Sequence, residues 1–419
     1  MRLMPVPDSR PLPATSPDEL SGPGLPLEIG LIVAGRFSLS ERRILQAVEL
    51  RFRQRLGSLL PRFDWRISVS RRRDMGEGGR LESTELLHQA TEERDLYRWD
   101  YAIVLIDKEL LAHYRSFALA VLSRPLDAAI VSTARLIPDE DGPGADHDQP
   151  DEDEIVERIT TLLLRSVAHL GGLKSSKEPD HLLYRPNAPA DLASMQILSD
   201  DEQQELVENL TEIADLRLEE SSPGRVSPWR FLLRASLINR EQILETIIAA
   251  RPWQFPRRLS RLTTAAVSTV ALLLMSAESW DLALTQSWGA MALISVLILL
   301  LTTVFISFRQ HLLLSRGNPY REQIAVTRIS AIGIVLSGLA LTWLFMFVLA
   351  LLANSLLFPV ELIEHWASSE QPGGSLIGPA SYGKMATFCA SVGLLIGALG
   401  ASFEEQTHFQ HVIFVDEEL

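Results

Sequence analysis

One trio of side chains in this sequence has types and a spacing that could bind a metal ion, and one further histidine lies at the end of a predicted helix. Glu404, His408 and His411 are four and three residues apart, so a helix would place all three on one face. Such a trio can bind zinc, although polar residues where a helix leaves an apolar stretch are usually just solvated. His169 lies three residues before Gly172 at the end of another predicted helix, where one imidazole is a single ligand and not a zinc site.

Other familiar catalytic patterns are missing from the sequence. It contains no Gly-x-Ser-x-Gly elbow and no phosphate-binding loop, and its one cysteine, Cys389, lies in an apolar stretch. A single cysteine excludes an intramolecular disulfide and a cysteine-based zinc cage. The acid-rich segment 139–157 does not keep the ligand spacing of a calcium loop, so we interpret it as a solvated loop.

Charge is unevenly distributed along the 419 residues. Of the 39 Lys and Arg residues, five lie in 262–419 and the other 34 lie in 1–261. This asymmetry excludes one soluble globule and indicates a polar front part joined to a membrane-embedded back part. Both parts are net acidic, at −8 (34 basic and 42 acidic residues) and −6 (5 basic and 11 acidic residues). Binding to nucleic acid through bulk charge is therefore not expected.

Four stretches of the back part contain no Asp, Glu, Lys or Arg and predict membrane-spanning helices. The charge-free stretches are 262–277, 282–308, 329–360 and 385–403, and we expect the spans that contain or overlap them at about 260–278, 286–308, 329–353 and 385–403. Crossing a hydrocarbon core takes about 20 helical residues, so three stretches are long enough and the first is marginal, with an interfacial helix as its alternative. Because no charged residue lies inside a span, an ion-coupled transporter or proton relay is not favoured.

Basic residues beside the spans are clustered on one side of the predicted bilayer. They precede the first span or lie between the second and third, at Arg251, Arg257, Arg258, Arg261, Arg309, Arg316, Arg321 and Arg328. Because Lys and Arg are retained on the cytoplasmic side, we expect both termini in the cytoplasm of a multi-pass cell-membrane protein. This orientation needs an even number of spans, which favours counting the marginal one.

A basic and aromatic run precedes the first span. We interpret 225–258 as an amphipathic juxtamembrane helix followed by an anchor, in which Trp253 and Phe255 lie at the level of the lipid headgroups. The arginines expected above anionic lipid are Arg251, Arg257, Arg258 and Arg261.

Small residues recur every four positions in the last span, at Cys389, Gly393, Gly397 and Ala401. Such a face lets helix backbones approach closely, so we expect it to pack against another span or against a second copy of the chain. Packing within the chain is the simpler interpretation. A homo-oligomer remains the alternative.

The front part alternates strand and helix patterns, which is typical of an α/β domain. Apolar β-prone runs predict strands at 27–34, 63–70, 101–106 and 128–133, and amphipathic patterns predict helices after Ser38 and at 83–94, 155–170 and 200–218. We divide the chain into a disordered Pro-rich leader, this α/β domain, the juxtamembrane segment, the membrane domain and an acidic tail, with boundaries 1–26, 27–220, 225–258, 259–403 and 404–419.

The order of these elements resembles archaemetzincin-type zinc peptidases. The resemblance covers the strand 101–106, a strand ending in Ser132-Thr133-Ala134-Arg135-Leu136, an acidic gap, and the helix that ends in Arg165-Ser166-Val167-Ala168-His169-Leu170-Gly171-Gly172-Leu173. In that family the helix carries His-Glu-x-x-His-x-x-Gly-x-x-His, in which three histidines bind zinc and the glutamate activates water.

The resemblance places the zinc-site positions of the family on residues of different chemistry. The first histidine, the glutamate, the second histidine, the bend glycine and the third histidine fall on Arg165, Ser166, His169, Gly172 and Ser175. Met195 corresponds to the methionine under the metal, and the later cysteine cluster has no counterpart. One imidazole cannot replace three ligands, a guanidinium repels a cation, and a serine is no general base, so the zinc chemistry is expected to be lost.

The predicted fold is therefore an α/β, zincin-like cytoplasmic domain followed by an all-α transmembrane four-helix domain. We expect a non-catalytic binding or regulatory domain with no cofactor, in contact with the lipid bilayer. A protein or peptide partner is expected because a peptidase-derived cleft keeps a strand edge that can pair with an extended chain. The alternative function is an oligomeric membrane pore or passage gated by the cytoplasmic domain.

Overall fold

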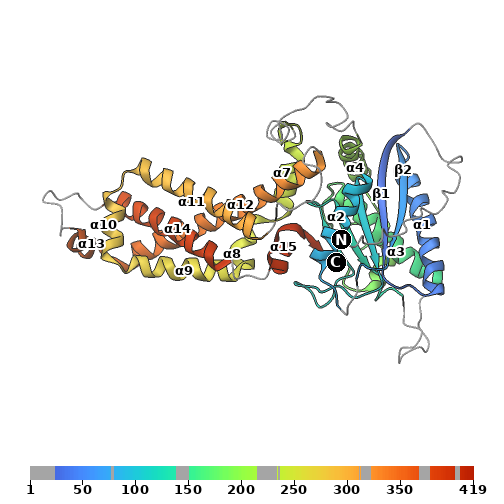
Figure 1. The fold of residues 1–419 in the computed structure, drawn as a ribbon, viewed down its shortest axis with the longest axis horizontal. Coiled ribbons are helices and arrows are strands. Elements are labelled where there is room, and N and C mark those ends of the chain that lie inside the picture. Colours follow the sequence, from blue (N-terminus) through green and yellow to red (C-terminus); the bar gives the residue numbers. More distant parts are fainter. Residues whose placement is uncertain are drawn as a thin grey trace, which may run out of the picture.

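The computed structural model describes residues 24–76, 80–137, 151–214, 234, 236–310, 312, 322–367, 378–401 and 406–419. An α/β lobe and an elongated helical lobe lie end to end along the long axis of the molecule (Figure 1). Most of the predicted leader 1–26, the part 139–150 of the acidic loop, and Glu404 lie outside the described residues.

A six-stranded sheet forms the centre of the α/β lobe. Its strands are β1 (Leu25–Ala34), β2 (Phe63–Arg72), β3 (Tyr101–Ile106), β4 (Ala120–Ser123), β5 (Ala128–Ser132) and β6 (Glu417–Glu418), in the spatial order β2-β1-β3-β5-β4-β6. Strands β2, β1, β3 and β5 are parallel, whereas β4 runs antiparallel to both β5 and β6. The α/β class and four strands agree with the sequence analysis, but β4 and β6 were not predicted.

Helices cover both faces of this sheet. They are α1 (Leu39–Leu59), α2 (Ser83–Tyr97), α3 (Glu152–Leu170) and α4 (Asp200–Ile213), with the 3-10 turn η1 (Pro189–Ala193) before α4. Because side chains alternate along a strand, Leu27, Ile29 and Leu31 of β1 pack in the cluster that contains α1, α3 and α4. Ile32 and Ala34 pack in the opposite cluster, which contains α2.

Capping explains where the first helix begins. The Ser38 hydroxyl accepts the amide of Glu41, and the Glu41 carboxylate accepts the amide of Ser38, so two otherwise unpaired helix donors are satisfied. The predicted capping box is therefore present. Helix α4 is described as far as Ile213, and residues 215–218 of the predicted helix lie outside the described residues.

The helical lobe contains most of the remaining helices. They are α7 (Arg240–Ala249), η2 (Pro252–Gln254), α8 (Phe255–Arg258), α9 (Ser260–Leu274), α10 (Ala277–Thr285), α11 (Trp288–Arg309), α12 (Glu322–Leu357), α13 (Val360–Ala367) and α14 (Pro379–Ala401). Helix α15 (Gln406–Phe414) lies between the two lobes (Figure 1). Three helices are long and apolar enough to cross a membrane, namely α11, residues 325–357 of α12, and α14.

The first predicted span is not one straight helix. Helices α9 and α10 meet at an angle of 88°, so the described residues hold three candidate spans, or four if this bent pair is one span. Ser276 explains the break, because its hydroxyl accepts the amide of Ser279 and donates to the Glu278 carboxylate, which starts a new helix. The predicted count of four transmembrane helices thus depends on the bent pair.

The small-residue face of α14 packs inside the chain. A Cβ atom added to Gly397 would lie 2.9 Å from the carbonyl oxygen of Leu262 in α9, and one added to Gly393 would lie 2.9 Å from Val270. This close contact between α9 and α14 requires glycine at both positions.

Replacing Gly397 with leucine is expected to lower the thermal unfolding midpoint in detergent by several degrees, because the side chain has no space against α9. Overpacking of this kind costs about 1–3 kcal/mol. Gly289→Leu is the matched control, since no neighbouring atom lies within 4 Å of a Cβ at this exposed position of α11. Equal midpoints for the two variants would contradict the described packing.

Candidate functional site

The candidate site lies where α3 ends. Gly172 follows the helix with a φ of +103°, a conformation that glycine adopts without strain. A Cβ there would lie 2.5 Å from the side-chain nitrogen of Asn209, which donates to the carbonyl oxygen of Gly171 at 2.9 Å. The chain therefore turns sharply at Gly172, as the sequence analysis expected for the bend glycine.

Arg165 is a charged residue in the interior of the lobe. Its side chain is 0% exposed, and its Nε donates to the carbonyl oxygen of Tyr184 at 2.9 Å. Its Nη2 donates to Glu417 Oε2 at 3.1 Å. Burial lowers the pKa of the guanidinium, and the charge of Glu417 opposes this shift. A buried cation needs such a partner, so Arg165 and Glu417 depend on each other.

Glu417, in β6, is bound by further groups of the α/β lobe. Ser175 Oγ donates to Glu417 Oε1 at 2.7 Å, and Arg185 Nε donates to the same oxygen at 2.5 Å. Burial alone would raise the pKa of this carboxyl group, but the charges of Arg165, His169 and Arg185 outweigh it and lower the pKa to about 2. The site therefore selects an ionised carboxylate.

His169 lies between two carboxylates. Its Nε2 is 2.7 Å from Asp416 Oδ2, and its Nδ1 is 3.3 Å from Glu417 Oε2, an ion-pair distance without hydrogen-bond geometry. Arg124 completes the binding of Asp416, because its backbone amide donates to Oδ1 at 3.3 Å and its Nε lies 3.7 Å from Oδ2. The imidazole is thus used to bind an acidic segment of the chain.

Glu418 is bound on the opposite side of β6. The backbone amides of His113 and Tyr114 donate to its two carboxylate oxygens at 3.0 Å each, and His411 Nε2 lies 2.8 Å from Oε1. Burial lowers the pKa of His411, and its contact with Glu418 opposes this shift. The side chains of Asp416, Glu417 and Glu418 are only 2% to 3% exposed.

Residues 416–419, hereafter the acidic segment, form an extended peptide along the edge of β4. Val121 pairs with Glu418 in the antiparallel register. The backbone amide of Leu419 donates to Ala120 at 2.9 Å, and the amide of Leu119 donates to Leu419 at 2.6 Å. The side chain of Leu419 is buried in the main core of the lobe. We call the surface that binds this segment the carboxylate groove.

Two other predicted zinc-helix positions have structural roles. The hydroxyl of Ser166 donates to the carbonyl oxygen of Leu162 at 2.7 Å, one turn back in α3. Met195 is fully buried and lines a hollow together with Thr161 and Leu164, and this hollow includes neither Arg165 nor His169. Met195 thus belongs to the core of the α/β lobe.

The two described histidines of the weak metal-binding candidate in the tail contact different groups. His408 Nε2 is 3.4 Å from the carbonyl oxygen of Arg258, whereas His411 contacts Glu418. Both rings pack on His113, with centroid distances of 5.5 and 4.2 Å. Within the part of the chain that the structure describes, no group of three or more His, Cys, Asp or Glu side chains is arranged to hold a metal ion.

The residues of the predicted membrane anchor differ in their exposure and in their contacts. Trp253 is 54% exposed, but Phe255 is 1% exposed and packs on Gly338 of α12. Phe255 thus contacts α12 of the same chain, and its position at the level of the lipid headgroups stays a prediction. The guanidinium of Arg258 lies 4.6 Å above the ring of Tyr114, so it contacts the α/β lobe.

The remaining anchor arginines differ in their surroundings. Arg257 and Arg261 are exposed. Burial and the like charge of Arg185 lower the pKa of Arg251, while Glu417 and Asp416 oppose this shift. Arg251 therefore adds positive charge near the carboxylate groove. Helix α7 of the predicted juxtamembrane segment packs within the helical lobe, since Ile247 contacts Gly333 of α12.

Sequence reasoning missed Arg124, Arg185 and the acidic segment as parts of the site. The sequence analysis treated 404–419 as a tail apart from the α/β domain, because consecutive acids are typical of an exposed segment. One local signal was present: the apolar run 412–415 directly precedes Asp416, and Leu419 follows the acids. Such a run is typical of a buried strand.

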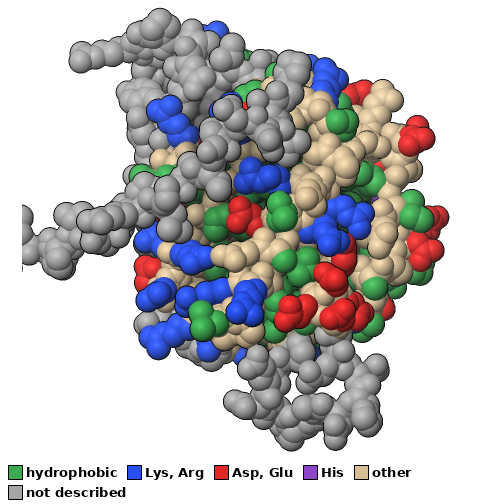
Figure 2. Space-filling view, turned by 90° about the vertical axis from the view of Figure 1, so that its right-hand side faces the viewer, with side chains coloured by type: hydrophobic (Ala, Val, Ile, Leu, Met, Phe, Trp, Pro, Cys, Tyr) green, Lys and Arg blue, Asp and Glu red, His purple; other side chains and the backbone are tan. Residues whose placement is uncertain are grey.

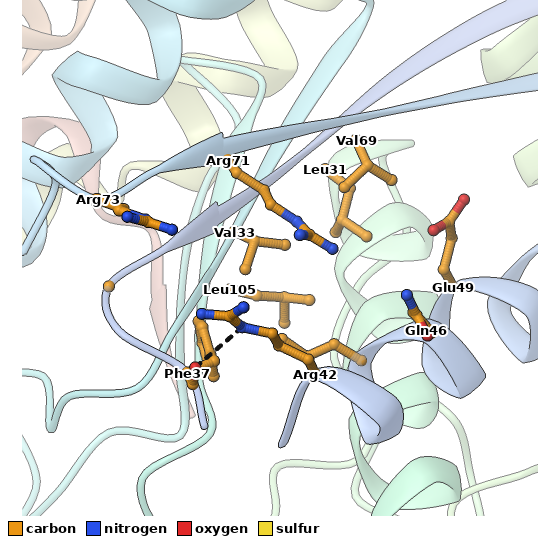
Figure 3. A pocket seen from close by; sticks show the side chains of 12 residues that line it. Leu31, Val33, Phe37, Arg42, Gln46, Glu49, Val69, Arg71, Arg73 and Leu105 are labelled. Carbon is orange, nitrogen blue, oxygen red and sulfur yellow. Dashed lines mark hydrogen bonds between the residues drawn. The ribbon is translucent and has the colours of Figure 1, made fainter. Parts of the chain in front are cut away.

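A second hollow lies at the carboxyl ends of β1 and β2, with an empty volume of about 650 Å³ that includes open solvent. The side chains of Arg42, Arg71 and Arg73 line it, and Arg42 Nε donates to the carbonyl oxygen of Phe37 at 3.0 Å (Figure 3). Lys and Arg side chains also gather on part of the end of the α/β lobe that is turned away from the helical lobe (Figure 2). Unlike Arg165, Arg71 and Arg73 are exposed.

No protein-family model matches the sequence, and no curated protein matches it. Among solved structures, the chain is similar to archaemetzincin from Methanopyrus kandleri, with 18% identity and a TM-score of 0.36 over 46% of this chain and 99% of that one. It is similar to a zinc-dependent peptidase from Methanocorpusculum labreanum, with 16% identity and a TM-score of 0.31 over 42% and 99%.

A third similar structure is archaemetzincin from Archaeoglobus fulgidus, complexed with malonate, with 14% identity and a TM-score of 0.32 over 43% of this chain and 99% of that one. The resemblance predicted from the sequence is confirmed in that these structure neighbours are archaemetzincin zinc peptidases.

Proposed function

We propose that this chain is a multi-pass membrane protein whose α/β lobe is a cytoplasmic, non-catalytic regulatory domain. In this proposal the carboxylate groove holds a peptide segment at the positions that the sequence resemblance assigns to zinc ligands. One observation carries the proposal: the Glu417 carboxylate is bound by Arg165, Ser175 and Arg185, with His169 at ion-pair distance.

The chemistry of these groups supports a non-catalytic role. Zinc hydrolysis needs three protein ligands around the metal and a base that activates the bound water. Here a guanidinium stands at one ligand position, and the nearby imidazole faces two carboxylates that belong to the same chain. Ser166 donates its hydroxyl to its own helix, so it provides no base.

The position of the groove supports a regulatory role. The acidic segment follows α15, which follows the apolar helix α14, so the groove holds the chain one short helix beyond the last candidate span. Arg258 and Tyr114 form a second contact between the membrane-proximal segment and the α/β lobe. Binding or release of the acidic segment would therefore change how the two lobes are connected.

The test of this proposal uses the full-length chain purified in detergent, together with His169→Ala. We expect zinc far below one atom per chain and no peptide hydrolysis in either protein, because His169 is one imidazole without partner ligands. Stoichiometric zinc with turnover that His169→Ala abolishes would reject the proposal. Orientation is checked by adding protease outside intact cells, which should leave the α/β lobe uncut.

A further inference from the structure

We infer that the carboxylate groove is a receptor for an acidic segment of a partner protein, which competes with the acidic segment of this chain for the edge of β4. The ligand is an extended peptide that carries Asp-Glu-Glu followed by an apolar residue. This inference rests on the proposed function, because it names the ligand of the same groove.

Each position of the bound segment has its own receptor in the groove. The first acid meets Arg124 and His169, and the second meets Arg165, Ser175 and Arg185. The third meets two backbone amides, and the apolar residue enters the core. Buried carboxylates that lose these donors stay unsatisfied, so the groove discriminates against neutral residues at all three acidic positions.

Nearly all of these binding groups belong to the α/β lobe. The donors come from β4 and the residues beside it, from α3, and from residues 113–114 and 175–185. His411 is the exception among the groups described above, since it lies in α15 beside the segment itself. A peptide that is not covalently joined to α15 can therefore make the same contacts, apart from the one with His411.

The acidic segment of this chain sets the affinity that a competing partner must exceed. Pairing with β4 is short, since it involves the two residues of β6 and the flanking Asp416 and Leu419, and ionised carboxylates lose much of their Coulomb gain to desolvation. The tether, however, gives the segment an effective concentration on the order of millimolar. A partner must therefore be held nearby or make contacts beyond the groove, which makes the attached segment an internal competitor.

The test measures binding of a fluorescent peptide, acetyl-Phe-Val-Asp-Glu-Glu-Leu-amide, to the full-length chain in detergent. In one variant Asp416→Asn, Glu417→Gln and Glu418→Gln are combined, which keeps the length of the chain but weakens its own segment. We expect this variant to bind the peptide about tenfold or more tightly than the unmodified chain, because each charge-assisted hydrogen bond contributes about 1.5–3 kcal/mol. Adding Arg165→Met should abolish binding, whereas adding Arg71→Met should not.

Two control peptides distinguish recognition of the sequence Asp-Glu-Glu-Leu from attraction by net charge. A peptide with glutamine at the second acidic position, and a scrambled peptide of the same charge, should each bind about tenfold or more weakly. If the combined variant fails to unfold cooperatively, Glu417→Gln alone replaces it. Equal binding by the unmodified chain and the variant, or equal binding of the scrambled peptide, overturns the inference.

Three further results also overturn the inference. Preferential transfer of the acidic segment from a second copy of the full-length chain into the groove of the variant would identify that copy as the occupant. A zinc-free, inactive protein that binds no peptide would reject the inference and leave the proposed non-catalytic role in place. Zinc-dependent hydrolysis would reject both.

Discussion

Replacing Arg165 with methionine is expected to release the acidic segment and to lower the free energy of unfolding by about 3–5 kcal/mol. Arg165 and Glu417 are both buried and bonded to each other, so loss of the guanidinium leaves a carboxylate without its main counter-charge. Methionine has a similar length and fills the space of the arginine stem, so the effect reports mainly on charge.

The release is measured by amide hydrogen exchange of residues 409–419 in detergent, and the stability by denaturant unfolding. Arg71→Met is the matched control, because Arg71 is exposed beside a different hollow and its loss should change stability by less than about 0.5 kcal/mol. The double variant Arg165→Met with Glu417→Gln should recover part of the loss, since neither buried charge then remains unpaired. Identical exchange in Arg165→Met and Arg71→Met would show that the ion pair does not hold the segment.

Acidification is expected to release the acidic segment before the lobe unfolds. The pKa of Glu417 is about 2 in the bound segment and 4.5 when free, so its ionised form stabilises binding by about 3 kcal/mol at neutral pH. This contribution is complete above pH 4.5 and is lost as the pH falls toward 2. The pKa of Glu418 is lowered as well, despite its burial, because His411 and two backbone amides bind its charge.

His411 also makes binding of the acidic segment depend on pH, at a higher pH than Glu417 does. Burial lowers its pKa below 6.5, so the neutral imidazole is favoured in the bound state and protonation favours release. Its contribution is present above pH 6.5 and decreases below it. The groups that face this ring are Glu418, His113, Glu82, Tyr114 and Ser83.

Acidification is expected to weaken binding of the acidic segment, whereas protonation of Asp127 is expected to stabilise the folded α/β lobe. Burial raises the pKa of Asp127 from 3.8 to about 6 even though Arg94 opposes it, so acidification through this range relieves an unfavourable charge in the folded lobe. Release must therefore be followed locally, by amide exchange of 409–419 corrected for the intrinsic pH dependence. We expect faster exchange as the pH falls below 6.5, because of His411, and again below 4.5, because of Glu417, with the second step weaker in Glu417→Gln. A flat profile between pH 4.5 and pH 2 would contradict the described ion pairs of Glu417.

The sequence alone determined the elements that depend on local pattern. Alternating Phe63, Trp65 and Ile67 predicted β2, and the absence of charges predicted the three helices that are long and apolar enough to span a membrane. Periodicity reports whether a side chain will be buried, because burial of apolar surface follows the repeat of each element. It also located the helix that carries Arg165 and His169.

Tertiary structure decided which charges meet. Arg165 and Glu417 are 252 positions apart, and nothing in the pattern around either residue shows that they pair. The sequence analysis therefore treated the last residues as a separate acidic tail, whereas arginines and a strand edge of the α/β lobe hold Asp416 and Glu417 in its interior. The contact of Phe255 was not predicted for the same reason, since its partner Gly338 lies on α12. A carboxylate or an aromatic ring is buried or exposed according to what the fold brings opposite to it, and that depends on contacts distant in sequence.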